Sequence, residues 1–268
     1  KYVAEFHEAF AHVYYNAHRN FTLQYQLILA AIAPEDDQDT INKKIKIVSR
    51  FIDQFIARRV FNFKSMNYST VLYTVFNLTI EMRRKSIDEL IVIVKNHLEQ
   101  MGLDLEAIDN FYLNQYTKRF IFHNLARMTQ FIEDKAGLNT RFEDYIDRVQ
   151  SNSYDIEHIL PNDMLALDDP DEFNSVDEFN RYRDSFAALV LLPKDKNRSL
   201  QDMPYKDKVK KYDSENLLAR TLHENCYKNN PLFLRFINDH GLDFKPYETY
   251  GRKEIDERQS LYKEICKM

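Results

Sequence analysis

Helix-breaking residues are scarce in this sequence, and this scarcity constrains the fold more than any other feature. Among 268 residues there are 4 glycines and 7 prolines. Before residue 150, apolar residues recur at intervals of three and four, the period of one face of an α-helix. This spacing predicts amphipathic helices over residues 3–17, 23–33, 40–57, 69–83, 87–101 and 111–135. The sequence therefore predicts a mostly α protein that begins with a helical bundle.

Further helices are expected after residue 150. The same spacing predicts helices over residues 176–183, 217–225, 231–239 and 254–267. Gly241 follows the third of these, where glycine can adopt the left-handed conformation that ends a helix. Ser86 is a candidate cap at the start of an earlier helix. We therefore predict a helical domain over residues 1–150 and a second domain over residues 151–268 with a helical C-terminal extension.

Two short strands followed by a helix are expected within the second domain. Residues 154–161 read Tyr-Asp-Ile-Glu-His-Ile-Leu-Pro, residues 188–192 are apolar, and residues 195–198 read Asp-Lys-Asn-Arg. Side chains alternate faces along a strand, so the chain must bend for neighbouring Glu157 and His158 to act together. Pro161 cannot donate to a ladder and biases the residue before it toward extended geometry. This fits a first strand that ends just after His158.

These strands carry the side chains of a one-metal phosphodiesterase. Glu157 and Asn197 offer oxygen ligands of the kind that Mg²⁺ or Mn²⁺ accepts, with waters and a phosphate oxygen in the remaining positions. His158 is then free to act as the general base. Asp155 shares a strand face with Glu157, so it is either a second ligand or a solvated strand residue. No glycine-rich phosphate loop is present, so no nucleotide cofactor is predicted.

Each of these residues also has an ordinary explanation. A histidine beside an isoleucine is more often a packed or surface residue than a catalytic one, and an asparagine after a turn is commonly a helix cap. The nuclease hypothesis therefore depends on the combination of order, spacing, strand character and the cations nearby. Cations there suit a nucleic-acid backbone, although those near residue 208 could equally form the solvated face of a helix. The candidate DNA-binding residues are Lys194, Lys196, Arg198, Lys206 and Lys208.

In these residues the sequence resembles the HNH, or ββα-metal, nucleases. The closest resemblance is to the C-terminal nuclease domain of GmrSD-type restriction systems, a group that includes SspE-like anti-phage proteins. The resemblance implies a metal-dependent DNA endonuclease that nicks or cuts DNA as the effector part of a restriction or anti-phage defence protein. It implies that His158 is the base and that Glu157 and Asn197 hold the metal. It also implies an N-terminal ParB-like sensor domain, which we expect to lie outside this chain because nothing here resembles it.

One departure from the family pattern concerns the start of the second strand. The family usually carries Gly-Asn there, and this sequence has Ala187 and Ala188. The family's asparagine braces the loop that carries the histidine, so Ala188→Asn is expected to raise the nicking rate. The departure leaves a second hypothesis open, a catalytically weak or inactive HNH-like domain that binds DNA or a partner protein.

Charge and cysteine content exclude several classes of protein. The net charge of −5 is not that of a free-standing DNA-binding domain, because phosphate neutralisation supplies most non-specific affinity. Cys226 and Cys266 form no CxxC pair, so neither a disulfide framework nor a structural zinc site is expected. No apolar run approaches bilayer length and no signal-peptide pattern is present. We therefore expect a cytoplasmic protein that has no membrane partner.

Overall fold

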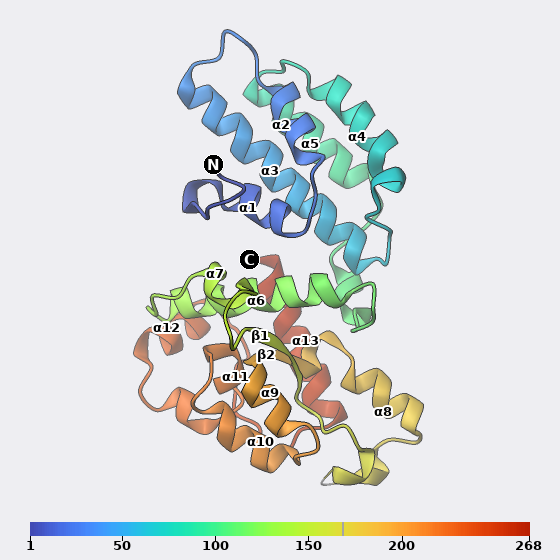
Figure 1. Cartoon of the computed structure of the whole chain (residues 1–268), viewed down its shortest axis with the longest axis vertical. Coiled ribbons are helices and arrows are strands. Elements are labelled where there is room, and N and C mark those ends of the chain that lie inside the picture. The colour runs from blue at the N-terminus through green and yellow to red at the C-terminus, as the bar shows by residue number, and fades with distance from the viewer. Residues whose placement is uncertain (168) are drawn as a thin grey trace. The chain divides into compact units, whose positions relative to one another are not determined.

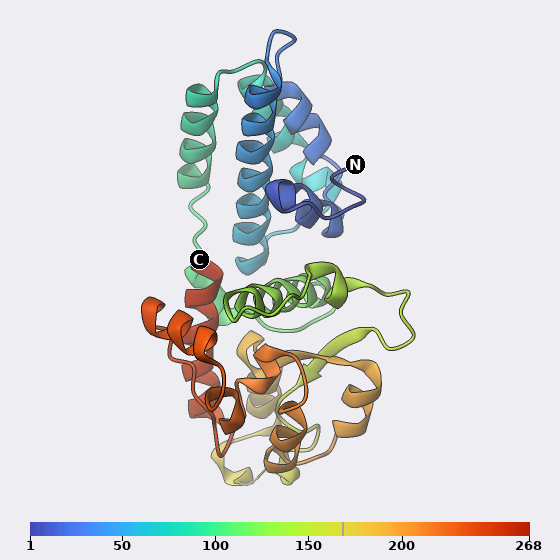
Figure 2. The ribbon, with the colours of Figure 1, turned by 90° about the vertical axis from the view of Figure 1, so that its left-hand side faces the viewer.

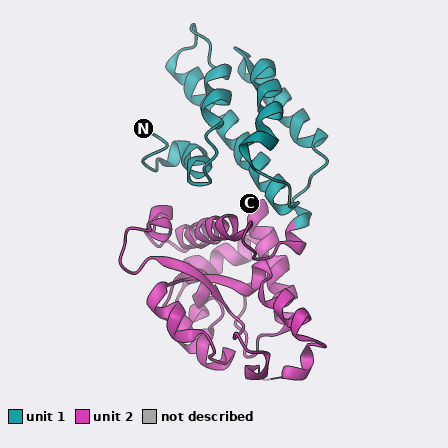
Figure 3. Ribbon diagram, turned by 45° about the vertical axis from the view of Figure 1, so that its right-hand side comes forward, with its two compact units in different colours: residues 1–107 teal, residues 108–268 magenta. Residues whose placement is uncertain are grey.

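The computed structural model describes residues 1–167 and 169–268. It is mostly helical, as the sequence predicted (Figure 1). The chain divides into two compact units, residues 1–107 and residues 108–268 (Figure 3). The units therefore divide earlier than the domain boundary predicted after residue 150. The reason is that the helix over residues 118–135 packs against the strands and helices that follow it.

The first unit is built around one long helix. The apolar faces of α1, α2 and α5 pack on α3, and α4 packs on α2; Figure 2 shows α3 and α5 side by side. Asp37 caps α3 by accepting the N–H of Thr40, and Ser86 forms the capping box of α5, where a cap was predicted. The helices are α1 (Ala11–His18), α2 (Gln24–Ala31), α3 (Gln38–Phe61), α4 (Tyr68–Met82) and α5 (Ile87–Gln100).

The second unit surrounds a two-stranded antiparallel hairpin with helices. Strand β1 (Tyr154–His158) pairs with β2 (Leu189–Pro193) in a register that sets His158 opposite Leu189. Helices α6 and α11 pack on β2, and α9 packs on both strands. The helices are α6 (Lys118–Lys135), α7 (Phe142–Ile146), α8 (Val176–Arg183), α9 (Lys194–Leu200), α10 (Tyr205–Tyr212), α11 (Leu217–Arg220), α12 (Pro231–His240) and α13 (Arg252–Lys267).

The core of this unit is centred on β2. Residues 189–192 of β2 have no exposed surface, which explains why this strand is continuously apolar instead of alternating. The predicted helix over residues 176–183 is present as α8. Helix α12 ends at Gly241, whose φ of 62° is left-handed, as predicted.

The predicted helices differ most from the structure at three places. Residues 8–10 form a 3-10 turn, and α1 begins only at Ala11. The helix predicted from residue 111 begins at Lys118, because the side chains of Asn114 and Thr117 bond to the backbone of residues 112–117 and turn it. The helix predicted over residues 217–225 is divided into α11 and the 3-10 turn Glu224–Tyr227. Across the described part of the chain, no helix is long and apolar enough to span a membrane.

Candidate active site

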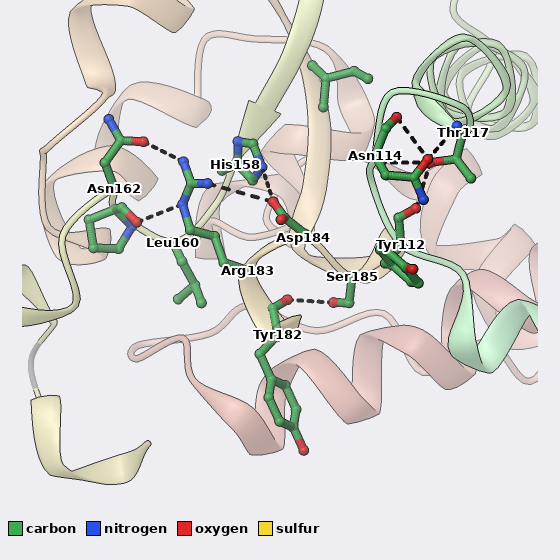
Figure 4. Close-up of polar contacts among 12 residues, drawn as sticks. Tyr112, Asn114, Thr117, His158, Leu160, Asn162, Tyr182, Arg183, Asp184 and Ser185 are labelled. Atoms are coloured by element: carbon green, nitrogen blue, oxygen red, sulfur yellow. Dashed lines mark hydrogen bonds and ion pairs between the residues drawn. The ribbon is translucent and has the colours of Figure 1, made fainter. Parts of the chain in front are cut away.

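His158 is the last residue of β1, where the chain leaves the hairpin. Its Nε2 lies 2.9 Å from Oδ1 of Asp184, the residue that follows α8 (Figure 4). The His158 side chain is 20% exposed and that of Asp184 is 36% exposed. Burial lowers the pKa of the His158 imidazole, and the hydrogen bond to Asp184 opposes this shift. The strand therefore ends where predicted, and it presents a histidine that is held by a carboxylate.

The turn after His158 is tied to the end of α8 by Arg183. Its Nε donates to the carbonyl oxygen of Pro161 at 2.9 Å, and Nη2 donates to Oδ1 of Asn162. Its Nη1 lies 3.7 Å from Oδ1 of Asp184. Figure 4 shows Arg183 between Asn162 and Asp184. Arg183 and Asp184 therefore hold the loop and the ring of His158 from the same chain segment.

Glu157 points into the protein, where it meets Lys208 from α10. Lys208 Nζ donates to Oε1 of Glu157 at 2.8 Å, to the carbonyl oxygen of His158 at 2.7 Å and to that of Leu160 at 3.3 Å. The hydroxyl of Tyr212 donates to the same Oε1 at 3.3 Å. Burial raises the pKa of the Glu157 carboxyl and lowers that of the Lys208 ammonium, and each charge opposes the shift of the other. The pair holds the bend at the end of β1.

Asn197 lies on α9, beside β1. Its Nδ2 donates to the carbonyl oxygen of Ile156 at 2.8 Å, which fixes the amide and directs its hydrogen-bond donor to the strand. Asp155 is a partly exposed strand residue whose Oδ1 accepts the N–H of Ile156. The fold thus brings Asn197 against the strand that carries Glu157 and His158, whereas Asp155 bonds locally.

The donors near β1 suit a small cation that needs few protein ligands. Within residues 1–167 and 169–268, no group of three or more His, Cys, Asp or Glu side chains could hold a metal ion. Mg²⁺ is often held by only one or two carboxylates, with waters and phosphate oxygens in the other positions. Among the described residues, no hydrogen bond engages Oδ1 of Asn197 or Oε2 of Glu157, although the Glu157 side chain is only 4% exposed and is paired with the Lys208 ammonium. The donor chemistry of Glu157 and Asn197 therefore fits Mg²⁺ or Mn²⁺.

The candidate DNA-binding cations differ in exposure. Lys196 and Arg198 on α9 and Lys206 on α10 are exposed, and Lys194 is partly exposed. The side chain of Lys208 is only 1% exposed and bonds within the protein. Lys208 therefore belongs to the packing beneath β1, and its placement does not support the predicted contact with DNA.

The two alanines that replace the family's Gly-Asn are fully buried. The carbonyl oxygen of Ala188 accepts the N–H of Ile159 at 2.9 Å, and that of Ala187 accepts the hydroxyl of Tyr250 at 2.8 Å. The backbone of Ala188 therefore still supports the loop that carries His158, although the residue has no side-chain amide.

Sequence reasoning missed Asp184 and the inward role of Lys208. The strand pairing offers a signal for Asp184. The strands are antiparallel and His158 pairs with Leu189, so the residues just before Leu189 lie near the end of β1 where His158 is. A carboxylate in that segment is within reach of the histidine. Lys208 carries no comparable signal, since a lysine on an amphipathic helix is ordinarily solvated.

The family comparison covers the unit that contains these residues. The family model described as "GmrSD restriction endonucleases, C-terminal domain" matches residues 99–265, a range that includes β1, β2, α9 and α10. Searches of curated proteins and of solved structures found no match. The family model spans more than half of the chain, and the resemblance noted in the sequence is confirmed. This chain belongs to the GmrSD restriction endonuclease family, through its C-terminal domain.

Proposed function

We propose that this chain is an HNH-type, ββα-metal endonuclease that nicks DNA with Mg²⁺ or Mn²⁺ as the effector part of a restriction or anti-phage defence protein. Membership of a restriction endonuclease family supports nuclease activity. The observation that carries the proposal is the hydrogen bonding of the two ring nitrogens of His158. Its Nε2 is bound by Asp184, and no hydrogen bond engages Nδ1 among the described residues. A ring held at one nitrogen and unengaged at the other is suited to accept a proton.

In the proposed reaction, His158 takes a proton from water at Nδ1, and the resulting hydroxide forms a bond to phosphorus. The bond between phosphorus and the leaving oxygen breaks, and that oxygen takes a proton from a solvent water. Glu157 and Asn197 would hold the cation through their side-chain oxygens. When bound, Mg²⁺ or Mn²⁺ supplies positive charge that offsets the negative charge developing on the phosphate and the leaving oxygen. Lys208 keeps Glu157 and the carbonyl oxygen of His158 in place.

DNA is the proposed partner, and it would be met in the cytoplasm. Lys194, Lys196 and Arg198 on α9, with Lys206 on α10, offer cations to the phosphate backbone on the elements next to the site. Because the whole chain carries a charge of −5, binding relies on this local group of cations rather than on net charge.

Two observations favour a second candidate, a weak or inactive domain that binds DNA or protein. Glu157 already carries the Lys208 ammonium as its counter-charge, and Ala188 lacks the amide of the family pattern. Either feature could reduce metal affinity or misplace the base. Activity measured on purified protein separates the two candidates.

The test is relaxation of supercoiled plasmid by the purified chain with Mg²⁺, Mn²⁺ or EDTA. The parent is expected to produce open circles with either cation and none with EDTA. His158→Ala should abolish nicking and leave the melting temperature close to that of the parent. His240→Ala, the same change at an exposed histidine at the end of α12, is the matched control and should remain active.

The outcomes are distinct. Cutting that resists EDTA, or full activity in His158→Ala, would overturn the proposed mechanism. A parent that binds DNA in a gel-shift assay but never nicks it with either cation would favour the binding domain.

A further inference from the structure

The Asp184 carboxylate can only accept a hydrogen bond, so its contact with Nε2 requires the proton of the neutral His158 ring to lie on Nε2. The lone pair is then on Nδ1. The opposite tautomer would set a ring lone pair against a carboxylate and leave an N–H where a proton must be accepted. The contact therefore selects one tautomer and one ring orientation.

We propose that Asp184 is the positioning residue of the nuclease site, orienting His158 and fixing the lone pair on Nδ1. The inference rests on the proposed function of His158 and adds a residue to it. In this role Asp184 acts through the histidine ring that it binds. When Nδ1 takes the proton of water, the ring becomes a cation that keeps its Nε2–H, and the hydrogen bond to the carboxylate becomes charge-assisted and stronger.

The backbone of Asp184 is held on both sides, which gives its carboxylate a defined position. Its N–H donates to the carbonyl oxygen of Asn180 in α8 at 2.9 Å, and its own carbonyl oxygen accepts the N–H of Leu113 at 2.7 Å. Two residues on, the N–H of Phe186 donates to the carbonyl oxygen of Phe111 at 2.9 Å. The chain segment 184–186 therefore lies pinned along residues 111–113.

Residues 111–113 are themselves fixed by a closed set of turn hydrogen bonds. The hydroxyl of Thr117 donates to the carbonyl oxygen of Tyr112 at 2.7 Å and accepts the N–H of Asn114 at 2.8 Å. Oδ1 of Asn114 accepts the N–H of Thr117 at 3.0 Å. Figure 4 shows this turn beside Ser185 and Asp184. A carboxylate supported in this way is prepared to hold the ring before substrate arrives.

The contact between Asp184 and His158 bears on the replacement of the family's asparagine by Ala188. The family pattern supplies an asparagine amide at that position to brace the histidine loop. The methyl side chain of Ala188 cannot form hydrogen bonds to this loop. In this chain the side-chain bond to the histidine comes from Asp184, four residues earlier in the same segment, while the Ala188 carbonyl oxygen binds the N–H of Ile159. The His158 ring is therefore held in place even though Ala188 replaces the family's asparagine.

The test uses the full chain with ¹⁵N-labelled histidine rings, at pH 8. Ring nitrogen spectra report the tautomer directly, and His158→Gln identifies the His158 signals. The variants are Asp184→Ala, which removes the acceptor, and Asp184→Asn, which keeps an oxygen at the same place. Asp177→Ala, an exposed carboxylate at the start of the same helix, is the control. Nicking rates and DNA affinity are measured on the same proteins.

The parent should show the Nε2–H tautomer at His158. Asp184→Ala should give a mixture of tautomers and lose about 100-fold in nicking rate with unchanged DNA affinity. Asp184→Asn should restore part of the Nε2–H tautomer and part of the nicking rate. Asp177→Ala should match the parent in both.

An Nδ1–H tautomer in the parent, or a rate lost in Asp184→Ala without a change of tautomer, would overturn the role of Asp184. A parent that shows the Nε2–H signal, loses it in Asp184→Ala and yet cuts no DNA would support the positioning role and overturn the nuclease proposal instead.

Discussion

The ammonium of Lys208 lies 2.8 Å from Oε1 of Glu157, and the two side chains are 1% and 4% exposed. The same ammonium donates to the carbonyl oxygens of His158 and Leu160, so one cation satisfies both the carboxylate and the bend that ends β1. The pair joins strand β1 to helix α10, since Lys208 lies 51 residues after Glu157 in the sequence. This relationship makes the local structure at His158 dependent on the fold of the whole unit.

Removing this cation should destabilise the protein strongly. Lys208→Ala leaves the Glu157 carboxylate buried without its partner, a change that costs about 3–5 kcal/mol in comparable buried pairs. Urea unfolding of the variant and the parent measures the difference. Lys210→Ala, on the exposed side of the same helix and paired with Asp207 at the surface, should leave the free energy of unfolding nearly unchanged. Equal stability of the two variants would contradict the structural role of Lys208.

Asn197→Ala should abolish metal-dependent nicking while the protein stays folded. The variant loses a proposed metal ligand and one hydrogen bond to Ile156, and that bond is worth about 1 kcal/mol. Nicking rate as a function of Mg²⁺ concentration, together with a melting curve, checks both effects. Asn229→Ala at an exposed position should behave as the parent. An unchanged Mg²⁺ dependence in Asn197→Ala would exclude Asn197 as a ligand.

Ala188→Asn should not raise the nicking rate, contrary to what the family pattern alone suggests. Ala188 has no exposed surface, so a larger polar side chain must displace neighbours and find partners for its amide. We expect the stability to fall by about 1–3 kcal/mol, the usual cost of overpacking a core. Initial nicking rates and thermal melting of variant and parent test this. A faster and equally stable variant would show that the site has room for the family's asparagine.

Lys196→Glu should weaken DNA binding and reduce its dependence on salt. Each lost phosphate contact lowers the slope of log affinity against log salt concentration by about 1. Binding to a short duplex is measured between low and moderate salt by fluorescence anisotropy. Lys253→Glu carries the same change of charge at an exposed position on α13 and serves as the control. Identical slopes for both variants would argue against a DNA contact on α9.

The thiol of Cys226 should resist modification at neutral pH. The residue is fully buried, and burial raises its pKa to about 11. The reactive thiolate therefore forms only as the pH rises toward that value. In a Cys266→Ser background, a disulfide reagent at pH 8 should label Cys226 in the unfolded protein and scarcely at all in the native one. Rapid labelling of the native protein would contradict its placement in the core.

The sequence by itself predicted the features that depend on short stretches of chain. Apolar periodicity located α8, and the pattern around His158 located β1, β2 and the helix that carries Asn197. The left-handed cap at Gly241 and the capping box at Ser86 followed from local backbone chemistry. The family was identifiable for the same reason, since its motif lies in short runs of neighbouring residues.

Tertiary structure alone decided which side chains meet. Lys208 has the sequence environment of a solvated lysine, yet it is buried because the turn after β1 and Glu157 lie across from α10. Asp184 has the environment of an ordinary residue after a helix, yet the antiparallel register carries it beside His158. Local propensity acts over a few residues, whereas the burial and pairing of a charge are decided by partners that only the folded chain brings within hydrogen-bond distance.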